Sequence, residues 1–240
     1  MSGLLSENLL AAENIDTFYG PSHILRNVTL RIRRGEAVSL LGRNGVGKTT
    51  FLRTLAGLVR AKNGRIAFTG REIGGLRASA IARAGLALVP EGRGIFRNLT
   101  VEENLQLACR PAAIGPSRAL DDIFAMFPRL AERRRNWGDQ LSGGEQQMLT
   151  IGRALLTNPS LLMIDEATEG LAPKVRDDIW RTLRLVREQG VAILVVDKNI
   201  DDLLALCDRH VILVKGEIVF EGSSTALRDN PDVIHTHLGI

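Results

Sequence analysis

The chain has 240 residues, with 31 basic side chains, 27 acidic side chains and two cysteines. Two cysteines are too few for a disulfide framework, so the composition favours a reduced, cytoplasmic protein. We expect no membrane span, because the longest apolar runs, such as 191–196, have the length of strands. We also expect no signal peptide, because residues 1–7 lack its basic and apolar segments.

The net charge of +4 and the pI near 9.5 raise the question of nucleic-acid binding. Of the 31 basic residues, 26 are Arg, and they are scattered except for the clusters at 31–34 and 133–135. Few aromatic residues lie among them, so a stacking platform for single strands is missing. We therefore interpret the basic side chains as a solvated or membrane-facing surface and predict no nucleic-acid partner.

Strand-like and helix-like segments alternate along the chain. Residues 28–33 alternate apolar and polar side chains, as in an edge or antiparallel strand, whereas 37–41 reads as a buried strand. The other expected strands lie at 66–68, 86–89, 161–164 and 191–196, with a hairpin at 211–220, and the expected helices lie at 101–108, 121–127, after 142, and at 175–188. Alternation of helices with buried strands predicts a mainly parallel sheet.

The middle of the chain differs from the rest because it is predominantly helical. It carries the helix breakers Pro111, Gly115, Pro116 and Pro128. We predict a single domain over 1–240, in which residues of about 95–155 form a helical subdomain inserted into the α/β core.

A phosphate-binding loop follows the expected strand at 37–41. Residues 42–50 read GRNGVGKTT and fit the pattern G-x-x-x-x-G-K-[ST], and a helix is expected directly after them. Glycines allow positive φ and the close approach of backbone N–H groups to an anion, and the helix N-terminus adds its dipole. The residues expected to bind a nucleoside triphosphate are Gly42, Arg43, Asn44, Gly45, Val46, Gly47, Lys48, Thr49 and Thr50. Lys48 would reach the terminal phosphates, and the Thr49 hydroxyl would bind Mg²⁺.

Two acids, Asp165 and Glu166, end the expected strand at 161–164. Parallel sheets bind ligands at such strand ends. We expect Asp165 to hold Mg²⁺, because hard cations prefer oxygen ligands, and Glu166 to orient and deprotonate an attacking water. Two solvated acids at a strand end are the alternative, which the phosphate-binding loop disfavours.

The third motif is LSGGEQQ, at residues 141–147, before an amphipathic segment. Ser142 and Glu145 have the spacing of a capping box, so a helix begins here. Gly143 and Gly144 leave the first helical turn bare, although each glycine costs a helix on the order of 1 kcal/mol. We therefore interpret the motif as a second phosphate-binding surface rather than as a simple helix cap.

With these three motifs in this order and spacing, the chain resembles the ATP-binding cassette (ABC) ATPases over nearly its whole length, and LSGGE is specific to that family. The resemblance implies an α/β fold: a P-loop NTPase core with a mainly parallel sheet, an N-terminal antiparallel β part and the inserted helical subdomain. It implies ATP and Mg²⁺ as ligands. It also implies a head-to-tail dimer, in which ATP lies between one subunit's phosphate loop and Ser142, Gly143, Gly144 and Glu145 of the other. Tyr19 matches the aromatic that stacks on adenine. Glu91 matches a loop residue that senses Mg²⁺ and the transmembrane partner.

A narrower resemblance is to the ATPase subunits of bacterial importers for branched-chain amino acids, carried by VPEGRGIF (89–96), LTVEENL (99–105), LSGGEQQML (141–149) and EGLAP (169–173). Importers for urea and short amides share features with residues 19–25. These resemblances imply a permease partner and, indirectly, an external solute-binding protein. They imply a peripheral location at the cytoplasmic face of the inner membrane, with the permease contacting 91–100 and the helical middle.

Several positions depart from the general cassette pattern. Glu91 stands where most members have Gln, Ala167 where Pro is usual, and Ala172 where many have Asp. Lys198 stands where the family has a His that contacts the γ-phosphate. We expect the ammonium of Lys198 to hold that phosphate electrostatically, although it cannot serve as a neutral proton relay.

Three hypotheses follow. The first is an ATP-hydrolysing importer subunit, in which Glu166 and Lys198 act at the reacting phosphate. The second is a cassette protein that works without a transporter, although such proteins usually carry two cassettes or long coiled-coil insertions. The third is a cassette in which Lys198 nearly silences hydrolysis. The four histidines (His23, His210, His235 and His237) form no metal-ligand pattern in the sequence.

Overall fold

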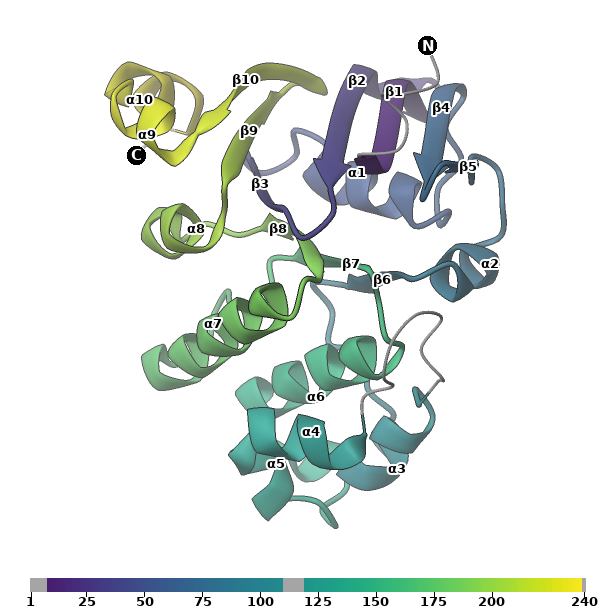
Figure 1. The fold of residues 1–240 in the computed structure, drawn as a ribbon, viewed down its shortest axis with the longest axis vertical. Coiled ribbons are helices and arrows are strands. Elements are labelled where there is room, and N and C mark those ends of the chain that lie inside the picture. The colour runs from purple at the N-terminus through teal and green to yellow at the C-terminus, as the bar shows by residue number, and fades with distance from the viewer. Residues whose placement is uncertain (1–7, 110–118, 239–240) are drawn as a thin grey trace.

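The computed structural model describes residues 8–109 and 119–238, which contain two β-sheets (Figure 1). The smaller sheet is antiparallel, with the order β2-β1-β4-β5. Its strands are β1 (Asn8–Tyr19), β2 (Ser22–Arg33), β4 (Asn63–Phe68) and β5 (Arg71–Glu72). The larger sheet has the order β10-β9-β3-β8-β7-β6 and is parallel except for β10, which pairs antiparallel with β9. Its strands are β3 (Ala37–Leu41), β6 (Leu86–Val89), β7 (Leu161–Asp165), β8 (Ala192–Val196), β9 (Arg209–Val214) and β10 (Glu217–Ser223).

The parallel sheet separates two hydrophobic cores. In β7, Leu161 and Met163 belong to one core, while Leu162 and Ile164 belong to the other. All five residues of β3, β7 and β8 are buried, because side chains on both faces are covered. This explains why these strands are continuous apolar runs, as is typical of parallel sheets.

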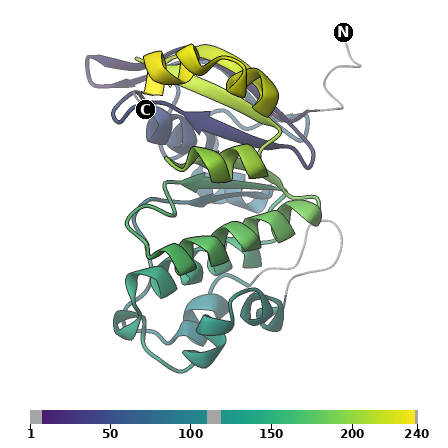
Figure 2. The ribbon, with the colours of Figure 1, turned by 90° about the vertical axis from the view of Figure 1, so that its left-hand side faces the viewer.

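Helices fill the space on each side of the parallel sheet. Helix α1 (Lys48–Leu55) packs between the two sheets through Phe51, Leu52 and Leu55. On the opposite face lie α6 (Gly143–Leu156) and α7 (Pro173–Glu188), and α3 to α5 lie beyond them, at the end farthest from the antiparallel sheet (Figure 2). The remaining elements are α2 (Ala78–Arg83), α3 (Val101–Gln106), α4 (Leu120–Met126), α5 (Pro128–Glu132), η1 (Gly138–Gln140), α8 (Ile200–Leu206), α9 (Ser224–Arg228) and α10 (Pro231–Leu238).

The fold class predicted from the sequence is confirmed, and several boundaries differ. The segment expected at 121–127 is followed by a separate helix, because Phe127 before Pro128 leaves the helical region (φ −125°, ψ 76°). Strand β1 was not predicted, since bulges and the positive φ of Asn14 interrupt its alternation. The two cysteines, Cys109 and Cys207, lie just beyond the ends of α3 and α8. The breakers Pro111, Gly115 and Pro116 lie outside the described residues.

Within the described residues, every helix is too short or too polar to cross a bilayer.

Candidate functional site

The phosphate-binding loop joins the buried strand β3 to helix α1. Gly42, Gly45 and Gly47 have φ values of 146°, 79° and 113°, as their predicted role requires. A Cβ atom on Gly42 would lie 2.4 Å from the carbonyl oxygen of Leu213, so glycine is needed there for packing as well. No side chain caps α1 at Gly47. The first N–H groups of α1 therefore have no partner within the helix and remain open to an anion.

Lys48 lies at the start of α1 and is buried. Its Nζ donates hydrogen bonds to the carbonyl oxygens of Gly42 (2.8 Å) and Arg43 (3.1 Å) and lies 3.7 Å from Oε1 of Glu166. Burial lowers the pKa of Lys48, and the nearby carboxylates of Glu166 and Asp165 act in the opposite direction. The side chain is thus folded back over the loop, with its charge beside the predicted catalytic acid.

Thr49 and Asp165 meet at the end of β7. The Thr49 hydroxyl donates a hydrogen bond of 3.1 Å to Oδ1 of Asp165, which is buried. Burial raises the pKa of Asp165, and the negative charge of Glu91, beyond the end of β6, raises it further. A hydroxyl and two carboxylates are the oxygen donors that Mg²⁺ prefers. The donors that these residues offer therefore fit a divalent cation.

Glu166 follows β7 with a positive φ of 49°, which is uncommon for a residue with a side chain. Its backbone N–H donates to the carbonyl oxygen of Val196 (2.8 Å), which fixes the turn against β8. Burial raises the pKa of Glu166, and hydrogen bonding to Glu169 raises it further. A raised pKa brings a carboxylate nearer to the value suited to a general base.

Lys48, Thr49, Glu91 and Glu166 line one cavity of about 370 Å³, whereas Asp165 is buried behind Thr49 and is not part of the lining. Its lining consists of Ile24, Asn44, Gly45, Gly47, Lys48, Thr49, Thr50, Glu91 and Glu166. Tyr19 is 45% exposed at the end of β1 and is not part of this lining. Ile24, near the start of β2, lines the cavity instead and was not singled out in the sequence.

The LSGGE motif begins α6, as predicted. Glu145 N–H donates to Oγ of Ser142 (3.3 Å), and Ser142 N–H donates to Oε2 of Glu145 (2.8 Å), which completes the capping box. Gly144 also has a packing reason, because a Cβ there would lie 2.6 Å from Cγ1 of Val175; at Gly143 a Cβ would meet only the flexible guanidinium end of Arg93, at 2.6 Å. Among the described residues, none from 142–145 lines the cavity at the phosphate loop.

Lys198 lies beyond the end of β8 and outside the cavity lining. Its Nζ is 2.5 Å from Oε1 of Glu169, in the loop after β7. Sequence reasoning did not single out Glu169, because 29 residues separate the two positions.

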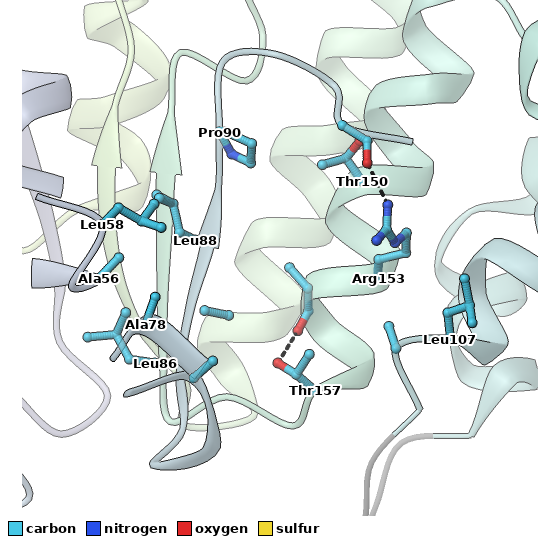
Figure 3. A pocket seen from close by; sticks show the side chains of 15 residues that line it. Ala56, Leu58, Ala78, Leu86, Leu88, Pro90, Leu107, Thr150, Arg153 and Thr157 are labelled. Atoms are coloured by element: carbon cyan, nitrogen blue, oxygen red, sulfur yellow. Dashed lines mark hydrogen bonds between the residues drawn. The ribbon is translucent and has the colours of Figure 1, made fainter. Parts of the chain in front are cut away.

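A second cavity, of about 390 Å³, forms a mainly apolar groove lined by β6, α2, α6 and the segments that follow α1 and α3 (Figure 3). Leu58, Leu86 and Leu88 lie on one side of it, with Arg153 and Leu107 on the other. Leu58 and Leu107 are about 60% exposed (59% and 61%). The loop that begins at Glu91 runs to this groove.

That loop is attached to α6 by its backbone. Thr150 Oγ1 donates to the carbonyl oxygen of Arg93, and Arg153 Nη1 donates to that of Gly94 (2.7 Å). The Arg153 guanidinium also lies over the ring of Phe96, 4.8 Å from its centre. The loop therefore connects the candidate metal site to the helix that begins with LSGGE.

Comparisons with known proteins identify the family. Residues 25–169 match the family model described as ABC transporter. The high-affinity branched-chain amino acid transport ATP-binding protein BraG of Pseudomonas aeruginosa is 40% identical over 232 residues, which cover 96% of this chain and 100% of BraG. The lipopolysaccharide export system ATP-binding protein LptB of Haemophilus influenzae is 34% identical over 236 residues, which cover 97% of this chain and 98% of LptB.

A solved dimeric ATP-binding cassette with ADP and phosphate bound has the same fold, with a TM-score of 0.78 and 25% identity. The match covers 90% of this chain and 98% of that chain. The chain thus has the nucleotide-binding loop, the acids and the fold of one family of ATP-hydrolysing proteins. It belongs to the ATP-binding subunits of the ABC transporters.

Proposed function

We propose that this chain is the ATP-hydrolysing subunit of an importer for branched-chain or other small hydrophobic amino acids. One observation carries the ATPase assignment: the uncapped start of α1, Lys48, Thr49, Glu91 and Glu166 line a single cavity. The 40% identity to BraG over nearly the whole of both chains supports the choice of solute.

In this proposal the phosphates of ATP bind the free N–H groups of α1, and Lys48 moves its charge from the loop carbonyls to the terminal phosphates. Thr49, Asp165 and Glu91 would hold Mg²⁺, which neutralises charge on the phosphates when bound. Glu166 accepts a proton from the attacking water, and Lys198 stabilises the terminal phosphate as a point charge.

We also propose that two such subunits close head to tail around ATP. The start of α6 lies outside the cavity of its own chain. Ser142, Gly143, Gly144 and Glu145 would therefore complete the site of a second copy or of a related ATPase. Tyr19, exposed at the end of β1, would stack on adenine. The match to a dimeric cassette supports this arrangement.

The apolar groove lined by β6, α2 and α6 is the proposed docking site for a short helix of the permease. It exposes Leu58 and Leu107, which would bury apolar surface on contact. The loop from Glu91 reaches this groove, so a movement of the permease helix would shift the loop and with it Glu91 at the candidate metal site. Such a complex would place the chain at the cytoplasmic face of the inner membrane, with an external binding protein on the far side.

Replacing Glu166 tests the ATPase mechanism. Glu166→Gln should bind ATP and lower turnover about 100- to 10,000-fold, the range for loss of a general base. The measurement is steady-state phosphate release at saturating Mg-ATP, with nucleotide binding measured in parallel. Normal turnover in Glu166→Gln would remove Glu166 from this role. If the wild type has no turnover and Lys198→His restores it, Lys198 suppresses hydrolysis in the isolated subunit.

Uptake by cells tests the solute and the partner. Deletion of the coding sequence should abolish uptake of labelled leucine, which the wild-type chain should restore and Glu166→Gln should not. Loss of urea or short-amide uptake with leucine uptake intact would identify the related importer instead. Failure of the chain to co-purify from membranes with a hydrophobic permease would favour a cassette protein that acts without a transporter.

A further inference from the structure

The pair formed by Lys198 and Glu169 joins two loops at the edge of the catalytic cavity. Lys198 Nζ lies 2.5 Å from Glu169 Oε1, and the side chains are 52% and 49% exposed. An ion pair this exposed adds little to folding stability, because water screens it and two long side chains lose freedom. Stability alone is therefore a weak reason for this arrangement.

The backbone beneath the pair is held rigidly. Thr168 Oγ1 donates a hydrogen bond of 2.6 Å to Oδ2 of Asp197, and both residues are buried. The other oxygen of Asp197 accepts the N–H groups of Lys198 (2.8 Å) and Asn199 (3.1 Å). Asp197 and Thr168 thus fix the loop after β7 to the loop after β8, and the two paired side chains extend from this fixed base.

The pair lies beside Glu166 and acts electrostatically on the cavity. Burial raises the pKa of Glu166, and the nearby carboxyl group of Glu169, three residues further along the loop, raises it further. The charge of Lys198 adds to burial in lowering the pKa of Lys48. The geometry agrees, because the N–H of Glu166, which lines the cavity, donates to the carbonyl oxygen of Val196, two residues before Lys198.

We propose that Glu169 is a positioning residue, which holds the Lys198 ammonium at the end of the cavity that receives the terminal phosphate. The Glu169–Lys198 pair then distinguishes ATP from ADP. This inference rests on the proposed ATPase function. A lysine carries its charge on a flexible four-carbon side chain. An ion pair with Glu169 restricts the Lys198 side chain before ATP binds, so less conformational freedom is lost when the ammonium contacts the phosphate. ADP lacks the γ-phosphate, so the positioned charge favours ATP.

The experiment measures the dissociation constants of ADP and of the β,γ-imido analogue of ATP by calorimetry on the full chain with Mg²⁺. The analogue is not hydrolysed, so the readout is independent of activity. Lys198→Gln should weaken analogue binding about ten-fold, the loss of one charge-assisted hydrogen bond, and should change ADP binding less than about two-fold. Glu169→Gln should weaken analogue binding in the same direction, by a smaller factor.

Three further variants separate positioning from a merely structural ion pair. Lys198→Arg keeps the charge and should keep the preference for the analogue. The double variant Glu169→Gln/Lys198→Gln should be no weaker than Lys198→Gln alone, because the two residues act as one unit. The exchange Glu169→Lys/Lys198→Glu retains an ion pair but puts the carboxylate at position 198. It should therefore lose the preference for the ATP analogue over ADP. Arg31→Gln breaks a comparably exposed pair with Glu13 (2.9 Å) on the antiparallel sheet and should change neither constant.

Retained ADP binding shows that each variant is folded. The inference is overturned if Lys198→Gln or Glu169→Gln leaves the ratio of the two constants unchanged, or if the exchanged pair behaves like the wild type. Those results leave the ATPase assignment standing. If the wild-type chain binds neither nucleotide, the proposed function itself is wrong, and this inference falls with it.

Discussion

Helices α1 and α6 both begin beside glycines, but their N-terminal ends are built differently. Helix α1 has no capping side chain and no acid in its first turn, and it places Lys48 there. Helix α6 has a complete capping box, with Ser142 as the cap and Glu145 in the first turn. A cation and missing caps are unfavourable at a helix N-terminus, whereas an acid and a cap stabilise it. The start of α1 therefore needs an anion, and the start of α6 is stable by itself.

This difference assigns phosphate binding within one chain to the start of α1 and leaves the start of α6 for contact with a second subunit. The start of α1 lines a cavity within one chain, so it can bind phosphates without help. The start of α6 lies outside that cavity and already carries a carboxylate, so in the proposed head-to-tail dimer it would meet the ATP of the other subunit. Nucleotide binding by one chain and turnover by two should therefore respond to different substitutions.

The largest expected effect comes from the glycine before α1. Gly47→Ala places a side chain at a φ of 113°, with its Cβ 3.0 Å from Cδ2 of Leu25. We expect ATP affinity of the isolated chain to fall about 100-fold, the loss of two hydrogen bonds to a charged group. Gly143→Ala is the matched variant: its Cβ meets only the flexible end of Arg93, so binding should stay unchanged while turnover falls. If both variants lost ATP affinity equally, the starts of α1 and α6 would not differ in their roles in nucleotide binding.

The second prediction concerns the packing of α6 on α7. A Cβ on Gly144 would lie 2.6 Å from Cγ1 of Val175. Gly144→Ala should lower the free energy of unfolding by about 1–2 kcal/mol, because overpacking outweighs the gain in helix propensity. Adding Val175→Ala should recover part of that loss, as measured by urea unfolding. A double variant as unstable as the sum of the two single variants would show that the contact is not the cause.

A smaller effect is expected from the cap of α6. Ser142→Ala should lower the free energy of unfolding by about 1 kcal/mol, and it should also reduce turnover. Thr100→Ala removes the corresponding cap of α3, where Glu103 N–H donates to Thr100 Oγ1 (3.2 Å). It should cost similar stability, with turnover unaffected. If both variants reduce turnover equally, Ser142 has only a structural role.

The smallest effect at neutral pH concerns the strand before the phosphate loop. His210 in β9 is buried between Ser39 Oγ (2.7 Å), in β3, and Ser224 Oγ (2.8 Å). Burial lowers its pKa to about 4 from 6.5, and the charge of Arg228 contributes. The unfolded chain therefore binds a proton first as the pH falls. The free energy of unfolding should decrease from pH 6.5 towards pH 4, by at most about 1.4 kcal/mol per pH unit from this group.

The control for this prediction is His210→Gln, which removes the titrating group. Urea unfolding should be measured for both proteins at pH 7 and pH 5. The free energy of unfolding of the wild type minus that of His210→Gln should be smaller at pH 5 than at pH 7. Titration of other groups cancels in the difference between the two proteins. A difference that is the same at both pH values would mean that His210 does not titrate in this range.

Local chemistry explains why so much of the site could be predicted. The conformation of residues 42–50 depends on glycines within the loop, and the capping box depends on two residues three positions apart. The acids after β7 follow a continuous apolar strand. Each of these features is set by near neighbours in the chain, so pattern and spacing were enough to predict them.

Tertiary contacts decided the remaining features. The ion pair of Glu169 and Lys198 exists because β7 and β8 are neighbours in the sheet, a pairing that no local pattern specifies. The close contact of Gly144 with Val175 depends on how α6 packs against α7. Strand β1 is not predicted from the sequence, because its bulges and its burial on both faces disturb the alternation of apolar and polar side chains.

The sequence by itself indicated the family, the buried strands of the parallel sheet and the glycine-rich segment 42–50, of which Asn44, Gly45, Gly47, Lys48 and Thr49 line the cavity. Those properties come from side-chain chemistry and short-range backbone geometry. The tertiary structure decided which charges meet at the cavity edge, how the glycines of α6 are used in packing, and where an apolar groove remains open. Those properties depend on contacts between segments far apart in the chain, which strand order and helix packing alone establish.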